Sequence, residues 1–84
     1  MLSFESNWLA QNADGCWQGR PPVEFNGIGI DSRAIQPGNL FIAIRGERHD
    51  GHSFVSQAFA NGARGAIVAK AMADRVARAP LLVV

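Results

Sequence analysis

The sequence has little cysteine, little lysine and no long hydrophobic run. The scarcity of cysteine and the absence of such a run each exclude a class of protein. Cys16 is the single cysteine among 84 residues, so the chain can form neither an internal disulfide nor a cysteine-based zinc site. No apolar run approaches the roughly 18–20 residues that cross a bilayer. The first residues, MLSFESNWLAQN, lack the basic start of a secretory signal. We therefore expect a cytoplasmic location and no membrane insertion.

Charge is nearly balanced. Eight Lys+Arg residues against seven Asp+Glu give a net charge of +1, which provides no long-range field to attract nucleic acid or an anionic membrane. Lys70 is the only lysine, so arginine supplies nearly all the positive charge. Arginine suits bidentate recognition of phosphate or carboxylate, which is a weak indication of an anionic ligand. No nucleic-acid partner is expected.

The motifs of nucleotide chemistry are also missing. There is no GxxxxGK[ST] phosphate loop, because Lys70 is followed by alanine. The GIG at 27–29 does not extend to GxGxxG, because Ser32 stands at the third glycine's position. Neither Ser32 nor Cys16 has the sequence context of a catalytic nucleophile. We predict no catalytic residue in this chain.

Alternating apolar runs and helix-like segments predict a single α/β domain over residues 1–84. Its sheet should be mixed but mostly parallel, with flanking helices, because strands separated by helices of about ten residues favour parallel pairing. The run LLVV at 81–84 ends the chain on an apolar strand and suggests a piece of a longer protein. The expected strands are 26–31, 40–44, 65–69 and 80–84, with a short one at 16–18, and the expected helices are 4–11, 52–61 and 71–78.

Local signals refine these boundaries. Pro37 and Gly38 predict a type II turn before the strand at 40–44. Gly62 predicts the end of helix 52–61, and Ser53 or Asp50 is a candidate for its N-cap. In strand 26–31 the two isoleucines should share one face, and the glycines on the other face permit close approach of another segment.

Two polar clusters flank the apolar run LFIAI: DSR before it and GERHDGH after it. If strands 26–31 and 40–44 are parallel, both clusters emerge at the carboxyl edge of the sheet, where α/β folds bind ligands. The groups brought there would suit a phosphorylated or nucleotide-like ligand, with the start of helix 52–61 adding free N–H groups. Two solvated loops beside a capped helix are an equally good interpretation. The polar groups are the Ser32 hydroxyl, the Arg33 and Arg48 guanidiniums and the backbone at Gly46.

A metal site is not predicted. His49, Asp50 and His52 do not match the HExxH spacing and lie on a loop that leads into a helix. Asp50 is better interpreted as a helix cap, and His52 as a hydrogen-bonding residue across the loop.

The segment IDSRAIQPGNLFIAIRGERHDGHSFVSQAFANGARGAIV resembles the N-terminal domain of the Mur ligases. The shared pattern is DSR, PG-x-LF-x-A, G-x-x-x-DGH-x-F and a later GA, and it covers residues 28–69 closely. The resemblance implies a small α/β domain of the Mur ligase N-terminal type within a three-domain cytoplasmic enzyme.

The resemblance also implies a function. Mur ligases build the peptidoglycan precursor, and their first domain holds its UDP end. ATP and Mg are bound elsewhere in the full-length enzyme, where an acyl-phosphate forms and the incoming amine attacks it. This chain alone would then hold no cofactor and be inactive, with the UDP-N-acetylmuramoyl-peptide and the other two domains as its partners.

Within the family, GERHDGHSF is more similar to members that add D-alanyl-D-alanine to the tripeptide precursor. Members that add diaminopimelate or lysine as the third residue are the alternative. A stand-alone nucleotide-binding module, or a domain whose loops bind nothing, are further alternatives.

The resemblance also implies roles for individual residues of the site. Ile30 and Ser32 fall where the family contacts uridine or its diphosphate. Within the two loops, the substrate-binding residues that the resemblance implies are Ile30, Ser32, Arg33, Gly46, Glu47, Arg48 and His49. Asp31, Asp50 and His52 are predicted to brace or cap the loops, and bracing is as good an interpretation of Arg33 as ligand contact.

Overall fold

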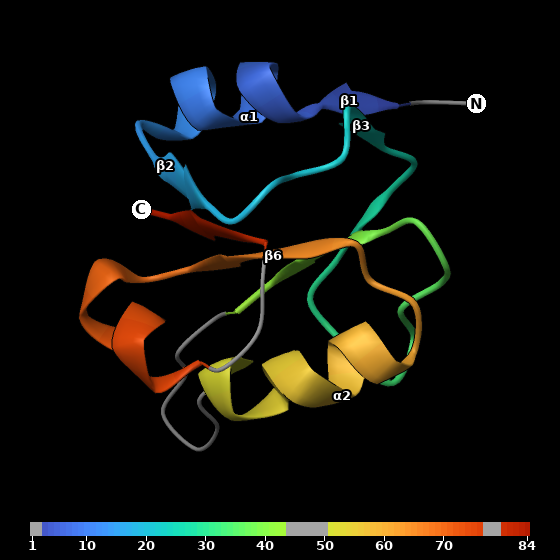
Figure 1. The fold of residues 1–84 in the computed structure, drawn as a ribbon. Helices are drawn as coiled ribbons and strands as arrows, with labels where there is room; N and C mark the ends of the chain where they lie inside the picture. The colour runs from blue at the N-terminus through green and yellow to red at the C-terminus, as the bar shows by residue number, and fades with distance from the viewer. Residues whose placement is uncertain (1–2, 44–50, 77–79) are drawn as a thin grey trace.

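A computed structural model describes residues 3–43, 51–76 and 80–84. A five-stranded sheet runs in the order β2-β7-β6-β5-β4, and β1 and β3 form a separate antiparallel pair (Figure 1). The strands are β1 Phe4–Glu5, β2 Cys16–Gln18, β3 Glu24–Phe25, β4 Ile28–Gly29, β5 Leu40–Ile42, β6 Gly65–Val68 and β7 Leu81–Val83. The helices are α1 Ser6–Ala13 and α2 Val55–Ala60, with 3₁₀ helices η1 Gly51–Phe54 and η2 Lys70–Arg75.

The sheet is mixed, as predicted. β4, β5, β6 and β7 are paired in parallel, and β2 is antiparallel to β7 at the edge. The α/β class and the mostly parallel sheet are therefore confirmed. No helix among the described residues is long and apolar enough to cross a membrane.

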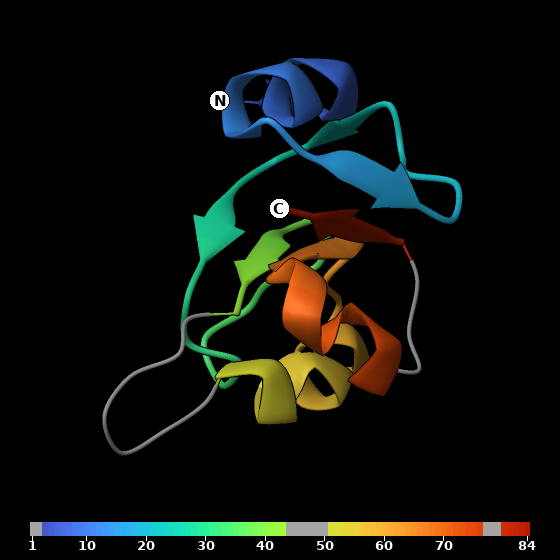
Figure 2. The same ribbon diagram turned by 90° about the vertical axis from the view of Figure 1, so that its left-hand side faces the viewer.

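Helices cover both faces of the sheet, so the domain has three layers. α1 and the β1–β3 pair lie on one face, and α2 and η2 on the other (Figures 1 and 2). Successive strand residues alternate between these layers: Leu40 and Leu82 pack beneath α1, whereas Phe41 and Leu81 pack toward α2. This alternation explains why LFIAI and LLVV are continuous apolar runs, since both faces of each strand are buried.

Strand 26–31 is shorter than predicted. β4 ends at Gly29, and the side chains of Ile28 and Ile30 are 42% and 65% exposed rather than in the core. The close approach expected at the glycines is confirmed, because a Cβ on Gly29 would lie 2.9 Å from Ile35 Cδ1. Ile35 itself is buried. The chain thus leaves the sheet early so that Ile35 can turn back into the core.

Both later helices differ from the prediction. Helix 52–61 begins as a 3₁₀ turn, and its α-helical part covers six residues with Phe54 at the N-cap and no side-chain cap, so Ser53 does not cap it. Segment 71–78 contains a 3₁₀ helix, with Met72 N–H bonded to the Ala69 carbonyl. Gly62 has a φ of 111°, which confirms its role after α2.

Candidate functional site

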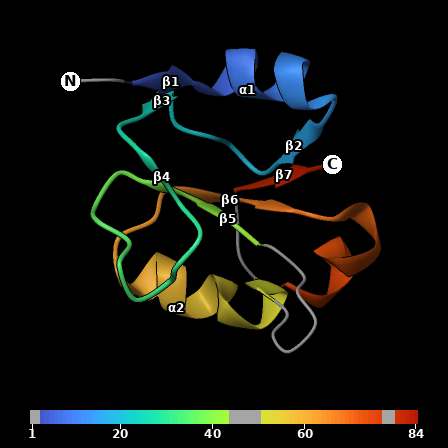
Figure 3. The same cartoon turned by 180° about the vertical axis from the view of Figure 1, so that it is seen from behind.

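The DSR motif forms a turn directly after β4. The Ala34 N–H donates to the Asp31 carbonyl at 3.0 Å and closes the turn, which we call the 30–34 loop with Ile30 included. β4 and β5 are parallel, with Ile28 opposite Leu40, so the loop follows the carboxyl end of β4 and then passes toward α2 (Figure 3). The parallel pairing and the place of the first polar cluster after β4 are as predicted, and its convergence with the second cluster stays a prediction.

Asp31 and Arg33 form an ion pair within this loop. Asp31 Oδ1 accepts hydrogen bonds from the backbone N–H of Arg33 at 2.9 Å and from its Nε at 3.2 Å. Nη2 of Arg33 lies 3.3 Å from Oδ2. These two side-chain donors leave three of the five guanidinium N–H groups outside the pair. The pair braces its own loop, and both side chains remain exposed, at 80% for Arg33 and 48% for Asp31.

The ion pair favours the charged form of both groups. The hydrogen bond from the Arg33 side chain is the main cause that lowers the pKa of Asp31, followed by the bond from the Arg33 backbone. The same side-chain bond raises the pKa of Arg33. The loop therefore presents a fixed guanidinium beside a carboxylate at its surface.

Ser32 lies differently from its two neighbours. It is 6% exposed, and its hydroxyl donates to Gln57 Oε1 at 2.7 Å. Asn61 Nδ2 donates to the main-chain carbonyl of Ser32 at 2.8 Å. The loop is thus anchored to α2 through one residue. Sequence reasoning missed Gln57 and Asn61, although their spacing of four places both on one side of a helix.

Ile30 completes the described part of the site. Its side chain is 65% exposed at the end of β4, where an apolar group next to a buried hydroxyl and an exposed guanidinium could contact a flat ring or a sugar. The 30–34 loop therefore offers apolar, hydrogen-bonding and cationic groups within five residues.

The second predicted loop lies outside the described residues. This applies to Gly46, Glu47, Arg48, His49 and Asp50, and the side chain of His52 is not described either. In the described ranges, no group of three or more His, Cys, Asp or Glu residues could hold a metal ion. The absence of a metal site remains a prediction, because the histidines fall outside that search.

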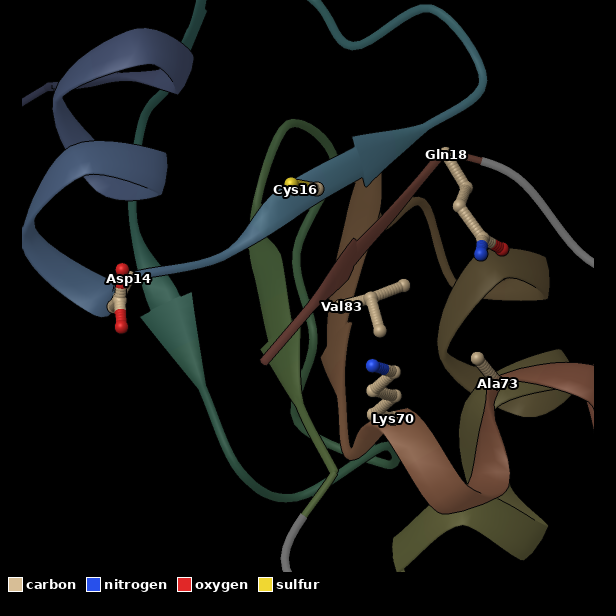
Figure 4. Close-up of a pocket in the computed structure, with 6 residues that line it drawn as sticks. All are labelled: Asp14, Cys16, Gln18, Lys70, Ala73 and Val83. Atoms are coloured by element: carbon tan, nitrogen blue, oxygen red, sulfur yellow. The ribbon is translucent and has the colours of Figure 1, made fainter.

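A pocket of about 460 Å³ lies beside the outer strand β2, at the side of the sheet away from β4 (Figure 4). Asp14, Cys16 and Gln18 line it from one side, and Lys70, Ala73 and Val83 from the other. None of the predicted site residues that the structure describes borders it. Throughout the described residues, the pocket lining included, no buried side-chain polar atom lacks a hydrogen-bond partner. No unsatisfied group therefore marks this pocket as a ligand site.

Comparison with known proteins identifies the family. A model described as "Mur ligase family, catalytic domain" matches residues 24–81. The chain belongs to the Mur ligase family. The resemblance carried by the DSR and DGH motifs is thereby confirmed.

Relatives from two branches of the family are similar to this chain. A UDP-N-acetylmuramoyl-L-alanyl-D-glutamate–2,6-diaminopimelate ligase of Syntrophomonas wolfei is 48% identical over 59 residues, or 70% of this chain and 12% of the relative. A UDP-N-acetylmuramoyl-tripeptide–D-alanyl-D-alanine ligase of Escherichia coli is 36% identical over 70 residues, or 83% and 15%.

Over the whole length of this chain, the fold matches part of a solved Mur ligase. A crystal structure of MurF from Acinetobacter baumannii superposes with a TM-score of 0.86 at 36% identity, covering 100% of this chain and 18% of that one. This chain therefore spans less than a fifth of the length of each relative described above.

Proposed function

We propose that this domain holds the UDP end of the UDP-N-acetylmuramoyl-peptide precursor for an ATP-dependent ligase that adds D-alanyl-D-alanine. Support comes from the match to MurF over the full chain, together with the position of the 30–34 loop after the carboxyl end of β4. Parallel α/β sheets bind ligands beyond the carboxyl ends of their strands. Such a ligase acts in peptidoglycan synthesis.

The remaining steps of such a reaction require residues that this chain does not have. It has no phosphate loop in its sequence, and the described part has no cluster of acidic ligands for a metal ion. ATP and Mg would therefore be held by the central and C-terminal domains of a longer ligase. This chain alone would bind the precursor and leave it unreacted.

Each group of the 30–34 loop suits one part of a UDP ligand. Ile30 offers an apolar contact to the uridine, Ser32 a hydroxyl, and Arg33 a guanidinium for the diphosphate. Gly46, Glu47, Arg48 and His49 would contact the uracil from the second loop. An isolated domain supplies part of the contacts, so we expect a Kd of roughly 0.1–1 mM for UDP.

Calorimetric titration with UDP and with ADP tests this proposal. UDP should bind more tightly than ADP, and Ser32→Ala should weaken UDP binding while the circular dichroism spectrum stays unchanged. Equal affinity for the two nucleotides would contradict a uridine site. An unfolded Ser32→Ala variant would make Ser32 a structural residue instead.

A second candidate is the branch that adds the third peptide residue. The 48% identity to the diaminopimelate ligase, over 59 residues, favours this second branch. The ligase that contains this chain can be incubated with ATP and either UDP-muramoyl-tripeptide with D-alanyl-D-alanine or UDP-muramoyl-dipeptide with diaminopimelate. We expect product from the first pair, and product from the second pair alone would move the chain to the other branch.

A further inference from the structure

Helix α2 and Asn61, the residue that follows it, hold the 30–34 loop by two hydrogen bonds to one residue. Gln57 Oε1 accepts the proton of the Ser32 hydroxyl, and Asn61 Nδ2 donates to the Ser32 carbonyl. These contacts join residues 25 and 29 positions apart in the sequence. The side chain and the main chain of Ser32 are therefore both oriented from α2 and the residue that follows it.

The direction of the Gln57 bond determines what the hydroxyl can offer a ligand. A serine hydroxyl has one proton and two acceptor lone pairs. Because the proton is committed to Gln57, the oxygen is left to accept a hydrogen bond from a ligand N–H or O–H group. A phosphate oxygen only accepts, so it would have to compete with Gln57 for the proton.

We infer that Gln57 is a positioning residue that presents the Ser32 oxygen as an acceptor to the uridine part of the ligand. The ribose hydroxyls and the uracil imide N–H are the donors that fit this geometry, and the diphosphate is left to Arg33. Asn61 donates to the Ser32 carbonyl and so holds the loop against α2. This inference rests on the proposed UDP site.

The Gln57→Leu variant tests the assignment because the two possible ligand contacts predict opposite results. Leucine removes the acceptor and lets the hydroxyl rotate, so we expect UDP affinity to fall about three- to tenfold, the effect of one lost hydrogen bond. If Ser32 instead donates to the diphosphate, removing its competitor should strengthen UDP binding. Unchanged or increased affinity overturns the inference.

Three further variants separate positioning from general damage. Gln57→Glu retains an acceptor for the Ser32 proton and should bind UDP better than Gln57→Leu. In a Ser32→Ala background, Gln57→Leu should cause no additional loss, whereas a structural effect of the leucine would persist. Gln11→Leu is the matched control, since Gln11 is exposed on α1 at the opposite face of the sheet (Figure 1).

The same titration separates the proposed UDP-binding function from the positioning role of Gln57. Wild-type chain that binds UDP while Gln57→Leu binds it equally well leaves the proposed function intact and removes Gln57 from it. Wild-type chain that binds neither UDP nor the complete UDP-muramoyl-tripeptide overturns the proposed function and the positioning role together. Thermal unfolding of each variant confirms that the compared proteins are folded.

Discussion

Two turns lie between β4 and β5, and they are held in different ways. The 36–39 turn is tied into the rest of the fold as well as to itself: the Gly38 N–H donates to the Gly62 carbonyl at 3.0 Å, and the Asn39 carbonyl accepts from the Arg64 N–H at 2.9 Å. The Asn39 N–H donates to the Gln36 carbonyl at 3.1 Å, and Asn39 Oδ1 accepts from the Gln36 N–H at 2.9 Å. Asn26 accepts from Asn39 and donates to the Pro37 carbonyl. These polar groups are engaged within a local scaffold.

The described 30–34 loop makes four hydrogen bonds within itself and two to residues of the α2 region, Gln57 and Asn61. Its charged residues pair with each other at the surface, and Ser32 is its described attachment to α2. Ile30 and Arg33 remain largely exposed. The two halves of one family motif are therefore held differently. The PG turn is tied into the fold through Asn26, Gly62 and Arg64, whereas the DSR turn leaves Ile30 and Arg33 at the surface.

The largest effect should follow from damage to the scaffold turn. Gly38 has a φ of 91°, and a Cβ there would lie 2.8 Å from Asn26 Cγ and closer still to its Nδ2. Gly38→Ala should lower the free energy of unfolding by about 2–4 kcal/mol, through left-handed strain and overpacking. Urea denaturation measures this. Gly19, exposed with a φ of 86°, is the control, and Gly19→Ala should cost about 1 kcal/mol. Equal costs would contradict the packing argument.

A smaller effect is expected from the asparagine network. Asn39→Ala removes the side-chain bonds to Gln36 and Asn26 and should cost about 1 kcal/mol, since both bonds are exposed. UDP affinity should not change. Asn12→Ala, which removes an exposed bond to the Trp8 carbonyl within α1, should be nearly neutral because alanine favours the helix. A loss of UDP binding in Asn39→Ala would show that the two turns are not separate in function.

The smallest effect concerns the ion pair of the 30–34 loop. The pKa of Asp31 is lowered in the folded state, so any stabilisation is present above the unfolded-state pKa and is lost as the pH falls through the folded pKa. Arg33→Ala should raise the pKa of Asp31 only part of the way to its ordinary value, because the backbone N–H bond remains. Carbon NMR of the carboxyl group measures this. An unchanged pKa would mean that the side-chain bond does not form in solution.

Much of the fold was predictable because burial is encoded locally. LFIAI, GAIV and LLVV are apolar at consecutive positions, which strands need when both faces are covered, and all three segments contain strands of the sheet. The β1–β3 pair was not predictable. Its strands are two residues long, and pairing Phe4 with Phe25 depends on the whole path of the chain between them.

The candidate site, like the fold, has a part that could be predicted from the sequence and a part that could not. The parallel order of β4 and β5 and the position of DSR after the carboxyl end of β4 follow from strand patterns. The burial of Ser32 does not, because a serine in a polar turn is ordinarily solvated, and its bond to Gln57 depends on how α2 packs. The role of residues 46–50, in the second predicted loop, stays a prediction.

Residue-resolved NMR during a UDP titration tests the central claim, that the 30–34 loop binds ligand while the 36–39 turn is scaffold. The account predicts amide shifts at residues 30–34 and in the 46–52 region that saturate at millimolar UDP, larger than with ADP, while 36–39 stay nearly unchanged. Shifts concentrated at 36–39, or at the pocket lined by Asp14 and Lys70, with none at 30–34, would contradict it.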